Sequence, residues 1–514
     1  MKNNILLYIL CACLGSLLIS SCEEDLPTGA EYSDYAFSML DEDGGTWTPI
    51  LLSAPEQIEI SAPVDVTSDA YLDELAELKS TAANLSNEQR ETMEYWTNNP
   101  IIRWNEIALE LVAKYNLIPG PNGDGSYTLP NPAQPDGPSL FPFAHPPYAS
   151  RMLAYLSVAQ FDGLVAAWHY KYKYNRQAPY EVDASIAHAY TDNNLPSYPS
   201  DAAVVAVASR EILSAMFPLE KEYLAEKAAE HLSSLSWAGA HVKSDIDAGQ
   251  HIGAEVAKIA LARAANDGMK YAQCPKPVSD SIKAAAFARF GWQWDNLEEP
   301  SRPVGLTPLF GKVKMWSVPT VEEVRPIPPP APGSAEFQEN VKELKYFADN
   351  MKNEWRRMAN YWQDGLGTYT PPGHWNKIAK DCIVRRNLNP LRTARTFAYM
   401  NMAIMDAGIS CWDAKYYYHY PRPIQTIPGY KTIAGTPNFP SYTSGHSAFS
   451  AAGAEVLSYL FPDEITQCTE WALEAAESRI YGGIHYRFDA EVGTDQGKKV
   501  AQYTIEVAKN DGAD

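Results

Sequence analysis

The residues best suited to hold a negatively charged group lie in three short stretches near the C-terminal end of the sequence. In KYYYHYPRP, Lys415 and Arg422 are seven residues apart, and SRIYGGIHYRFD adds Arg479. In PSYTSGHSAFS, Ser444 and Gly445 come before an alanine-rich run that predicts a helix, whose free N-terminal backbone N–H groups attract an anion. Because guanidinium forks and ammonium groups suit phosphate-like oxygens, we predict a pocket for a compact tetrahedral oxyanion.

Two histidines and an aspartate in the same stretches add proton chemistry. His446 follows Gly445 directly, and His485 lies four residues before Asp489, so these last two side chains can share one helical face. The carboxylate can then orient the imidazole and fix its tautomer. A glycine pair before His485 can break the helix and fold Arg479 back toward it. A surface salt bridge would explain the last stretch alone, but the three stretches together predict one site.

The order of these motifs resembles the signature shared by type 2 phosphatidic acid phosphatases, bacterial acid phosphatases and vanadium-dependent haloperoxidases. It reads Lys-x6-Arg-Pro, Pro-Ser-x-x-Ser-Gly-His and Ser-Arg-x5-His-x3-Asp. The resemblance implies that His446 is the acid–base residue, and that His485 is the nucleophile of a phosphatase or the residue bonded to vanadium in a haloperoxidase. Asp489 matches the aspartate of the motif. The resemblance also implies that the oxyanion is held by Lys415, Arg422, Ser444, Gly445 and Arg479.

The resemblance covers roughly residues 100–505 and is greatest to secreted bacterial haloperoxidase-like proteins, through stretches such as RWNEIALE, PPGHWN and SRIYGGIHYRF. That branch folds as two helical bundles with the oxyanion site in the second. The shortest phosphatase motif reads Pro-Ser-Gly-His, whereas SYT follows Pro440 here, a wider form familiar in the haloperoxidase-like branch. Trp412 and Phe439 match positions near the halide site of haloperoxidases, although aromatic residues at helix ends are more often core.

A cradle for a tetrahedral oxyanion serves two reactions. The favoured one is vanadate-dependent oxidation of a halide by hydrogen peroxide, with vanadate as cofactor. The alternative is hydrolysis of a phosphomonoester through a phosphohistidine, which needs no cofactor. A third hypothesis is a non-catalytic surface lipoprotein that captures phosphate, but capture needs donors rather than a nucleophile and a proton shuttle. Both enzymatic hypotheses imply a small-molecule substrate, and the sequence leaves the oligomeric state open.

The sequence around these motifs predicts an all-α protein. Alanine-rich runs such as ASRMLAYLSVAQFDGLVAAWHYKYKY and GAEVAKIALARAAND place apolar residues three and four apart, and alternating strand-like runs are scarce. The prolines of VRPIPPPAPGSAEF forbid a helix. We therefore predict an N-terminal helical bundle over 63–320, a Pro-rich connection over 321–337, and a C-terminal helical bundle over 338–514 that holds the oxyanion site. No short internal repeat is evident.

The N-terminal residues predict export. MKNNILLYILCACLGSLLISSC has the form of a secretory signal over 1–21 and, ending in ISSC, resembles a bacterial lipoprotein signal in which Cys22 is lipidated. With the acidic EED that follows, it predicts an outer-membrane lipoprotein, at the cell surface or in the periplasm of a Gram-negative bacterium, attached to the membrane through its lipid alone. Residues 22–62 are acidic and predict a tether or loosely packed arm.

Charge and the remaining polar residues limit the partners. The formal net charge of −21 argues against nucleic acid or an anionic membrane surface. The cysteines after Cys22 are far apart without a CxxC pair, which leaves one or two disulfides open and indicates no zinc site. His374 could line the pocket or be structural. Asp162 and Glu106 are predicted to be interhelical hydrogen-bond partners, with metal binding a remote alternative.

Overall fold

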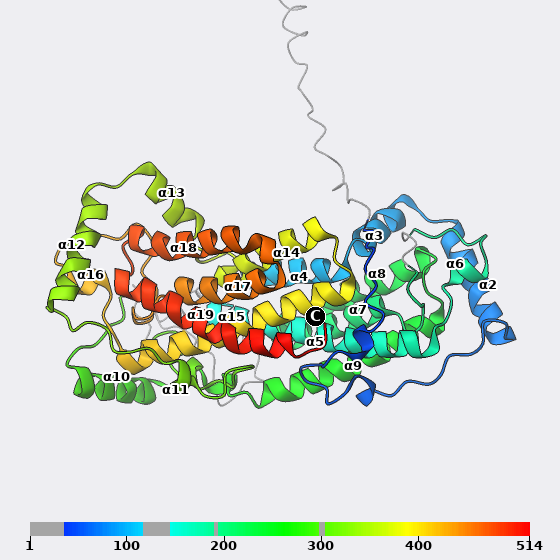
Figure 1. Ribbon diagram of the computed structural model, residues 1–514, viewed down its shortest axis with the longest axis horizontal. Coiled ribbons are helices and arrows are strands. Elements are labelled where there is room, and N and C mark those ends of the chain that lie inside the picture. Colours follow the sequence, from blue (N-terminus) through cyan, green and yellow to red (C-terminus); the bar gives the residue numbers. More distant parts are fainter. Residues whose placement is uncertain (1–34, 117–143, 190–193, 298–303, 514) are drawn as a thin grey trace, which may run out of the picture. The chain divides into compact units, whose positions relative to one another are not determined.

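Helices form all the regular structure in the part of the chain that the structure describes. This computed structural model describes residues 35–116, 144–189, 194–297 and 304–513, without a strand among them (Figure 1). The predicted all-α fold is confirmed. The predicted signal segment and the lipidated Cys22 lie outside the described residues.

The first part of the described chain contains α2 (Asp69–Ala83), α3 (Asn87–Thr97), α4 (Pro100–Tyr115), α5 (Pro146–Tyr174), α6 (Pro179–Val182), α7 (Asp201–Met216), α8 (Lys221–Trp237), α9 (Lys243–Ala265) and α10 (Lys276–Phe290). The second part contains α11 (Val321–Val324), α12 (Ala335–Asp349), α13 (Asn353–Tyr361), α14 (Thr370–Arg386), α15 (Pro390–Tyr418), α16 (Pro423–Thr426), α17 (Gly445–Leu460), α18 (Ile465–Tyr481) and α19 (Arg487–Lys509).

The helix order and helix lengths of the first part recur in the second. α5 and α15 both have 29 residues, α7 and α17 both have 16, α8 and α18 both have 17, and α9 and α19 both have 23. Each of these later helices begins 244 residues after its counterpart, as Pro146 and Pro390 show for α5 and α15. We call residues 40–267 the first repeat and residues 306–511 the second repeat.

A buried aspartate in the middle of each long helix fixes a loop of its own repeat. Asp162 in α5 accepts hydrogen bonds from the backbone N–H groups of residues 50–52 at 2.6–2.9 Å. Asp406, at the same place in α15, does the same for residues 316–318 at 2.7–3.3 Å. The predicted interhelical role is therefore wrong for Asp162, whose partners belong to a loop. Glu106 does make its predicted interhelical contact, from α4 to α14.

The beginning of each repeat is hydrogen-bonded to the end of the other. The Thr48 N–H donates to the Asp511 carbonyl at 2.7 Å, and the Lys314 N–H donates to the Asp267 carbonyl at 2.8 Å. Both bonds join a lead-in loop of one repeat to the residue just after the last long helix of the other. The two repeats are therefore connected reciprocally at these ends as well as through the chain.

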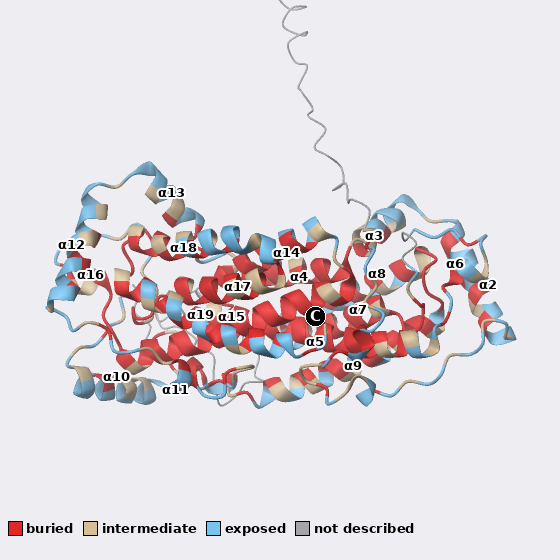
Figure 2. Ribbon diagram, in the orientation of Figure 1, coloured by how far each residue is buried: buried red, intermediate tan, exposed pale blue. Residues whose placement is uncertain are grey.

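The centre of the molecule is the pair formed by α5 and α15, which pack against each other. Both helices are buried along most of their length, and their residues belong to one hydrophobic cluster that spans both repeats (Figure 2). Beside this pair, the Asn105 side chain of α4 donates to the Asn376 side chain of α14 at 2.9 Å. α7 packs on α9 in the first repeat, as α17 packs on α19 in the second.

Residues 35–62 pack on the helices, so the prediction of a loosely packed arm is wrong for this part of 22–62. Trp47, Leu52 and Ile58 are buried in the central cluster. The backbone N–H groups of residues 50–52 donate to the Asp162 carboxylate instead of to carbonyls of a helix. The segment therefore does not need a sequence with helical periodicity in order to pack.

The Pro-rich segment lies inside the second repeat rather than between the two halves. Its backbone carbonyls accept hydrogen bonds from the hydroxyl groups of Tyr418, Tyr420 and Tyr442 at 2.5–2.7 Å. Prolines supply no N–H donor, but their carbonyls remain available, so this extended segment is held by side chains. The predicted connection over 321–337 is thus an internal strap of the second repeat, and α10 lies between the repeats.

Two further observations concern membranes and cysteines. Within the described residues, none of the helices has the length and apolar character that crossing a bilayer requires. The four cysteines of this part of the chain are buried, with free thiols: Cys274, Cys382, Cys411 and Cys468.

Candidate oxyanion site

The predicted oxyanion residues come from helix ends of the second repeat. Lys415 lies in the last turn of α15, and Arg422 immediately precedes α16. Ser444 is the N-cap of α17, Arg479 lies in the last turn of α18, and His485 comes just before α19. Each of these five side chains belongs to a residue that is at most 2 % exposed. The fold thus gathers them at one end of the repeat.

Asp489 orients His485 as predicted from their spacing. Its Oδ2 lies 2.9 Å from His485 Nδ1 and also accepts from Ser441 Oγ at 2.5 Å and from the Tyr486 N–H at 3.1 Å. Because the carboxylate accepts, we assign the imidazole proton to Nδ1, which makes Nε2 an acceptor. Nε2 accepts a hydrogen bond from Arg422 Nη1 at 3.0 Å. Ser441 was missed, although it stands in the Pro-Ser-x-x-Ser-Gly-His motif.

Three buried cations of the site have no counter-charge in direct contact. Lys415, Arg422 and Arg479 form no ion pair with a carboxylate among the described residues. Burial lowers the pKa of Lys415 to about 7 and the pKa of each arginine to about 10. Burying a charge without a partner is costly, so a bound anion would stabilise this arrangement.

Lys415 also shapes the turn that precedes α17. Its Nζ donates to the carbonyls of Pro440, Ser441 and Thr443 at 3.0, 2.9 and 2.5 Å. These three bonds use the donors of the ammonium group. Lys415 therefore has no N–H left to donate to an oxyanion. It can act through its charge and by fixing the turn that positions Ser444.

Two buried polar atoms in the site have no hydrogen-bond partner among the described residues. They are Arg422 Nη2 and His446 Nε2. Burial, followed by the charge of Arg479, lowers the pKa of His446 well below its usual value, so this histidine is neutral and can accept a proton. An unsatisfied buried polar group costs about 1–3 kcal/mol. A tetrahedral oxyanion would accept from the arginine and exchange a proton with the histidine, so the donor set fits phosphate or vanadate.

Gly445 leaves room beside this donor set at the N-terminus of α17. A Cβ atom at this position would meet only Phe449 and Trp412, both at 3.7 Å, which is ordinary contact. The position could therefore carry a side chain, and its absence keeps the helix N-terminus open to a ligand.

An aromatic wall flanks the cations. The rings of Trp412 and Phe439 lie 4.9 Å apart, and the Trp412 indole N–H donates to the Leu306 carbonyl at 3.2 Å. Lys415 Nζ is 5.0 Å and the Arg422 guanidinium 5.2 Å from the centre of the Phe439 ring. The two residues predicted beside the site do lie there, and they reduce the access of water to the cations.

His374 belongs to a cluster that supports the site from α13 and α14. Its Nδ1 lies 3.1 Å from both Asp364 oxygens, its Nε2 lies 3.3 Å from the Tyr361 hydroxyl, and its ring stacks on Trp362 at 4.3 Å. Backbone groups next to this cluster hydrogen-bond to His446 and oppose the lowering of its pKa. His374 thus holds the segment that covers His446. The sequence offered no motif for this segment.

A further contact ties α13 to the site. Arg479 Nη2 donates to the Ala359 carbonyl of α13 at 2.7 Å, and Arg479 Nε donates to the Ser478 hydroxyl at 2.9 Å. Among the described residues there is no group of three or more His, Cys, Asp or Glu side chains that could hold a metal ion.

Comparisons with known proteins agree with this geometry. The PAP2 superfamily model matches residues 396–511, which contain every residue of the predicted motif. The vanadium chloroperoxidase of Curvularia inaequalis is 22% identical over 244 residues, covering 30% of this chain and 40% of that protein. The predicted relationship to the haloperoxidase and PAP2 superfamily is confirmed.

Solved structures of this superfamily resemble the fold as well. A bacterial vanadium-dependent iodoperoxidase structure matches with a TM-score of 0.56 and 25% identity, covering 71% of this chain and 91% of that one. A bacterial vanadium-dependent chloroperoxidase in its holo form matches with a TM-score of 0.52 and 15% identity, covering 71% and 93%. The second likeness is one of fold alone. The chain covers less than half the length of the curated fungal relative.

Proposed function

We propose that this chain is a haloperoxidase-like enzyme that oxidises a halide with hydrogen peroxide at a vanadate held by His485. The observation that carries this proposal is the pair of unsatisfied buried atoms, Arg422 Nη2 and His446 Nε2, in a cationic pocket with an aromatic wall. Vanadate bound there would supply a Lewis-acidic centre that activates hydrogen peroxide toward halide.

The residues of the chain have distinct tasks in this proposal. Asp489 fixes the orientation of His485, whose Nε2 would bind vanadate in place of its hydrogen bond from Arg422. Arg422 and Arg479 would hold the oxygens of the vanadate, and Lys415 would supply positive charge from behind the turn. Halide, peroxide and a proton give hypohalous acid and water, so the reaction consumes a proton. Neutral His446 takes up that proton from solvent and delivers it at Nε2.

The aromatic wall favours the haloperoxidase over the phosphatase. Trp412 and Phe439 place apolar ring surface directly beside the cations, which supports a weakly hydrated halide over the polar leaving alcohol of a phosphomonoester. The likeness to a solved bacterial iodoperoxidase, over 91% of that chain, also supports this choice.

Phosphomonoester hydrolysis is the second candidate, and one observation favours it. Asp489 holds His485 Nδ1, so Nε2 is the nitrogen left to attack phosphorus once Arg422 Nη1 turns from it to the phosphate oxygens, as a phosphohistidine mechanism needs. His446 would then protonate the leaving oxygen and later activate water. In this reaction no cofactor is required.

Two rates measured on the same preparation, starting after Cys22, separate the candidates. One is bromination or iodination of a dye with peroxide, with and without vanadate, and the other is hydrolysis of a generic phosphomonoester. Halogenation that requires vanadate and is lost in His485→Ala and His446→Ala supports the proposal. Hydrolysis that vanadate inhibits and the same variants abolish would replace it with the phosphatase. Tight phosphate binding without either rate would indicate a capture protein.

We further propose that the chain is an outer-membrane lipoprotein of a Gram-negative bacterium. The ISSC sequence that ends at Cys22 supports this. The full-length chain should partition into the detergent phase and incorporate labelled fatty acid, and Cys22→Ala should do neither. Protease added to intact cells would then distinguish the cell surface from the periplasm.

A further inference from the structure

We infer that the first repeat contains a second oxyanion pocket, which the Asp201 carboxylate fills from within by pairing with Lys171 beside His241. The inference does not depend on which reaction the second repeat catalyses. It rests on three observations. Polar residues recur at equivalent positions of the two repeats, a cavity in the first repeat is lined by Lys171, Asp201 and His241, and Lys171 and Asp201 form an ion pair inside that cavity.

Several polar residues of the C-terminal site recur 244 residues earlier in the chain. The pairs are Lys171 with Lys415, Ser197 with Ser441, Ser200 with Ser444, His241 with His485, and Asp245 with Asp489.

The hydrogen bonds of these pairs recur too. Lys171 Nζ donates to the Pro196 carbonyl at 2.6 Å, as Lys415 does to that of Pro440. The Ser200 N–H donates to the Asp245 carbonyl at 3.0 Å, where the Ser444 N–H donates to that of Asp489 at 2.9 Å. The Asp245 carboxylate accepts from the Val242 N–H at 3.0 Å, as Asp489 does from Tyr486. The first repeat therefore has the backbone frame of an oxyanion site.

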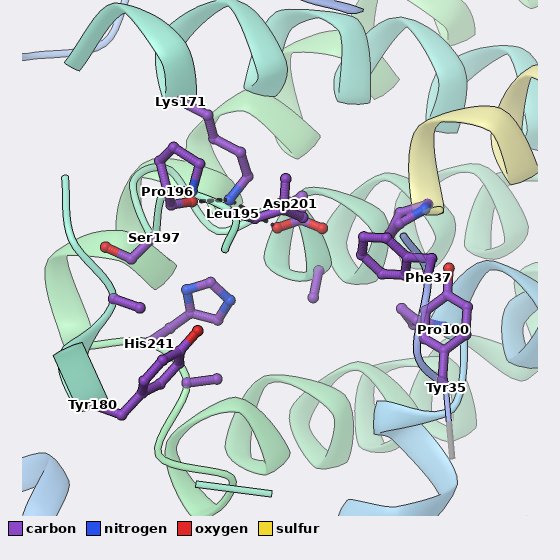
Figure 3. Close-up of a pocket in the computed structure, with 14 residues that line it drawn as sticks. Tyr35, Phe37, Pro100, Lys171, Tyr180, Leu195, Pro196, Ser197, Asp201 and His241 are labelled. Carbon is purple, nitrogen blue, oxygen red and sulfur yellow. Dashed lines mark hydrogen bonds and ion pairs between the residues drawn. The ribbon is translucent and has the colours of Figure 1, made fainter. Parts of the chain in front are cut away.

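A cavity of about 60 Å³ marks the place of the oxyanion in this frame. It is lined by Lys171, Asp201 and His241, together with the aromatic rings of Phe37 and Tyr180 (Figure 3). About one probe sphere of space holds a single water, so this cavity has room for a small polyatomic ion or several waters. His241 is 9 % exposed, and its Nδ1 has no hydrogen-bond partner among the described residues.

Asp201 is the residue that closes the cavity to an anion. It stands where the second repeat has Gly445, the position at which a side chain can be accommodated. Its carboxylate forms an ion pair with Lys171 at 3.0 Å. Burial opposes ionisation, but Lys171 and then His241 hold the pKa of Asp201 below its usual value, so the carboxylate stays charged. In the first repeat, Asp201 supplies the negative charge that a bound anion would supply in the second repeat.

The first repeat has also lost the groups that would make such a site react. The equivalents of Arg422, His446 and Arg479 are Ala178, Ala202 and Leu235.

The histidine of the first repeat is no longer oriented by its aspartate. Arg176 pairs with Asp245, and His241 Nδ1 is 3.9 Å from the nearest Asp245 oxygen, against 2.9 Å between His485 and Asp489. With Asp201 removed, Lys171 and the start of α7 would still attract an oxyanion, but the first repeat has no counterpart of His446 to transfer a proton to it.

The test opens the pocket in a chain whose C-terminal site is silenced by Arg422→Ala with Arg479→Ala. The probe is inorganic phosphate, and the measurement is the midpoint of thermal unfolding of the full mature chain. The silenced chain should not respond to phosphate. Adding Asp201→Gly should lower the midpoint without phosphate and make it rise by about 1–2 °C once phosphate exceeds its Kd tenfold.

A second substitution shows whether Lys171 is the group that holds the phosphate. Lys171→Met combined with Asp201→Gly should remove the phosphate response. If Asp201→Gly does not fold, Asp201→Ala also removes the carboxylate from the cavity and carries the same expectation. The inference is overturned if neither folded variant responds to phosphate, if the response survives Lys171→Met, or if the silenced chain with Asp201 intact already binds phosphate.

Discussion

The two repeats have a buried lysine at equivalent positions, and the charge of this lysine is compensated differently in each repeat. Lys171 is paired with Asp201 within its own repeat, whereas Lys415 contacts only backbone carbonyls and lies near two further buried cations. Removing a partner from a buried ion pair costs about 3–5 kcal/mol. The first repeat avoids that cost with a carboxylate of its own, and the second repeat relies on a ligand to offset it.

This difference separates a stabilising arrangement from a functional one. A buried cation that is paired with a carboxylate of the same chain does not attract an external anion. A buried cation without such a partner attracts an anion, but it lowers the stability of the fold. Much of this difference comes from one pair of equivalent positions, which is occupied by Asp201 in the first repeat and by Gly445 in the second. Substitutions at equivalent positions can therefore test it directly.

The largest effect is expected from moving the internal carboxylate into the second repeat. Gly445→Asp should reduce the oxyanion-dependent rate by a factor on the order of 10³, because the carboxylate would take the place of the ligand and repel it. It should also raise the midpoint of thermal unfolding in the absence of ligand. Gly445→Asn, of the same shape without the charge, is the control, and equal unfolding midpoints for the two variants would contradict the comparison.

A smaller effect is expected from the serines that neighbour the aspartates. Ser441→Ala should lower kcat about 10-fold to 100-fold, because Asp489 loses the hydroxyl that helps to fix its orientation on His485. Ser197→Ala is the matched change in the first repeat, where the hydroxyl donates only to the Gln177 carbonyl, and the rate should not change. Steady-state kinetics of both variants decide the matter, and similar losses in both would show that the serine supports folding instead.

A pH dependence should be found in the second repeat. Since burial lowers the pKa of Lys415 to about 7 without ligand, the ammonium form dominates below about pH 6, is half lost at about pH 7 and falls further as the pH rises. Sulfate, whose charge is constant in this range, should bind up to about tenfold more weakly per pH unit above 7. Calorimetric titration from pH 6 to 9 measures this, with Lys415→Met as a control that should bind weakly throughout. A flat profile in the unmodified chain would disprove the role of the lysine.

The smallest effect should be equal in the two repeats. Asp162→Asn and Asp406→Asn should each lower the free energy of unfolding by about 1–3 kcal/mol, because the asparagine amide would set an NH2 donor against a backbone N–H that the carboxylate accepts.

The same two aspartates predict a dependence of stability on pH. Burial raises the pKa of each to about 6, so the folded chain keeps protons that the unfolded chain has released. The free energy of unfolding should therefore fall as the pH rises from about 4 to 6, and each asparagine variant should lose part of that slope. Denaturant titrations at several pH values measure both effects. If only one of the two asparagine variants changed the free energy of unfolding, the two aspartates would not have equivalent roles.

The sequence could predict that the C-terminal residues lie close together because they belong to compact motifs. Lys415, Arg422, Ser444 and His485 are each fixed by a helix end, and helix ends leave clear signals of proline, glycine and capping residues. The relation of His485 to Asp489 follows from helical spacing alone. These parts of the site needed no knowledge of long-range contacts.

The repeat and the supporting residues could not be predicted in the same way. Lys171 and His241 have the same spacing as Lys415 and His485, but the stretches around them lack counterparts of Arg422, His446 and Arg479, so only the shared backbone arrangement reveals the relation. Asp364 reaches the site through His374, and residues 50–52 are held by a carboxylate more than a hundred residues away. Interactions of this kind leave no local periodicity.

The reciprocal bonds at the ends of the repeats bear on how the chain unfolds. Thr48 is joined to Asp511 and Lys314 to Asp267, so each repeat is completed by the terminus of the other. Loss of structure in either repeat removes hydrogen bonds and apolar contacts from its counterpart. The chain should therefore lose its structure in one cooperative transition rather than two, and the C-terminal site cannot be cut out as an independent domain. The inert repeat is, in effect, a permanently attached folding partner for the reactive one.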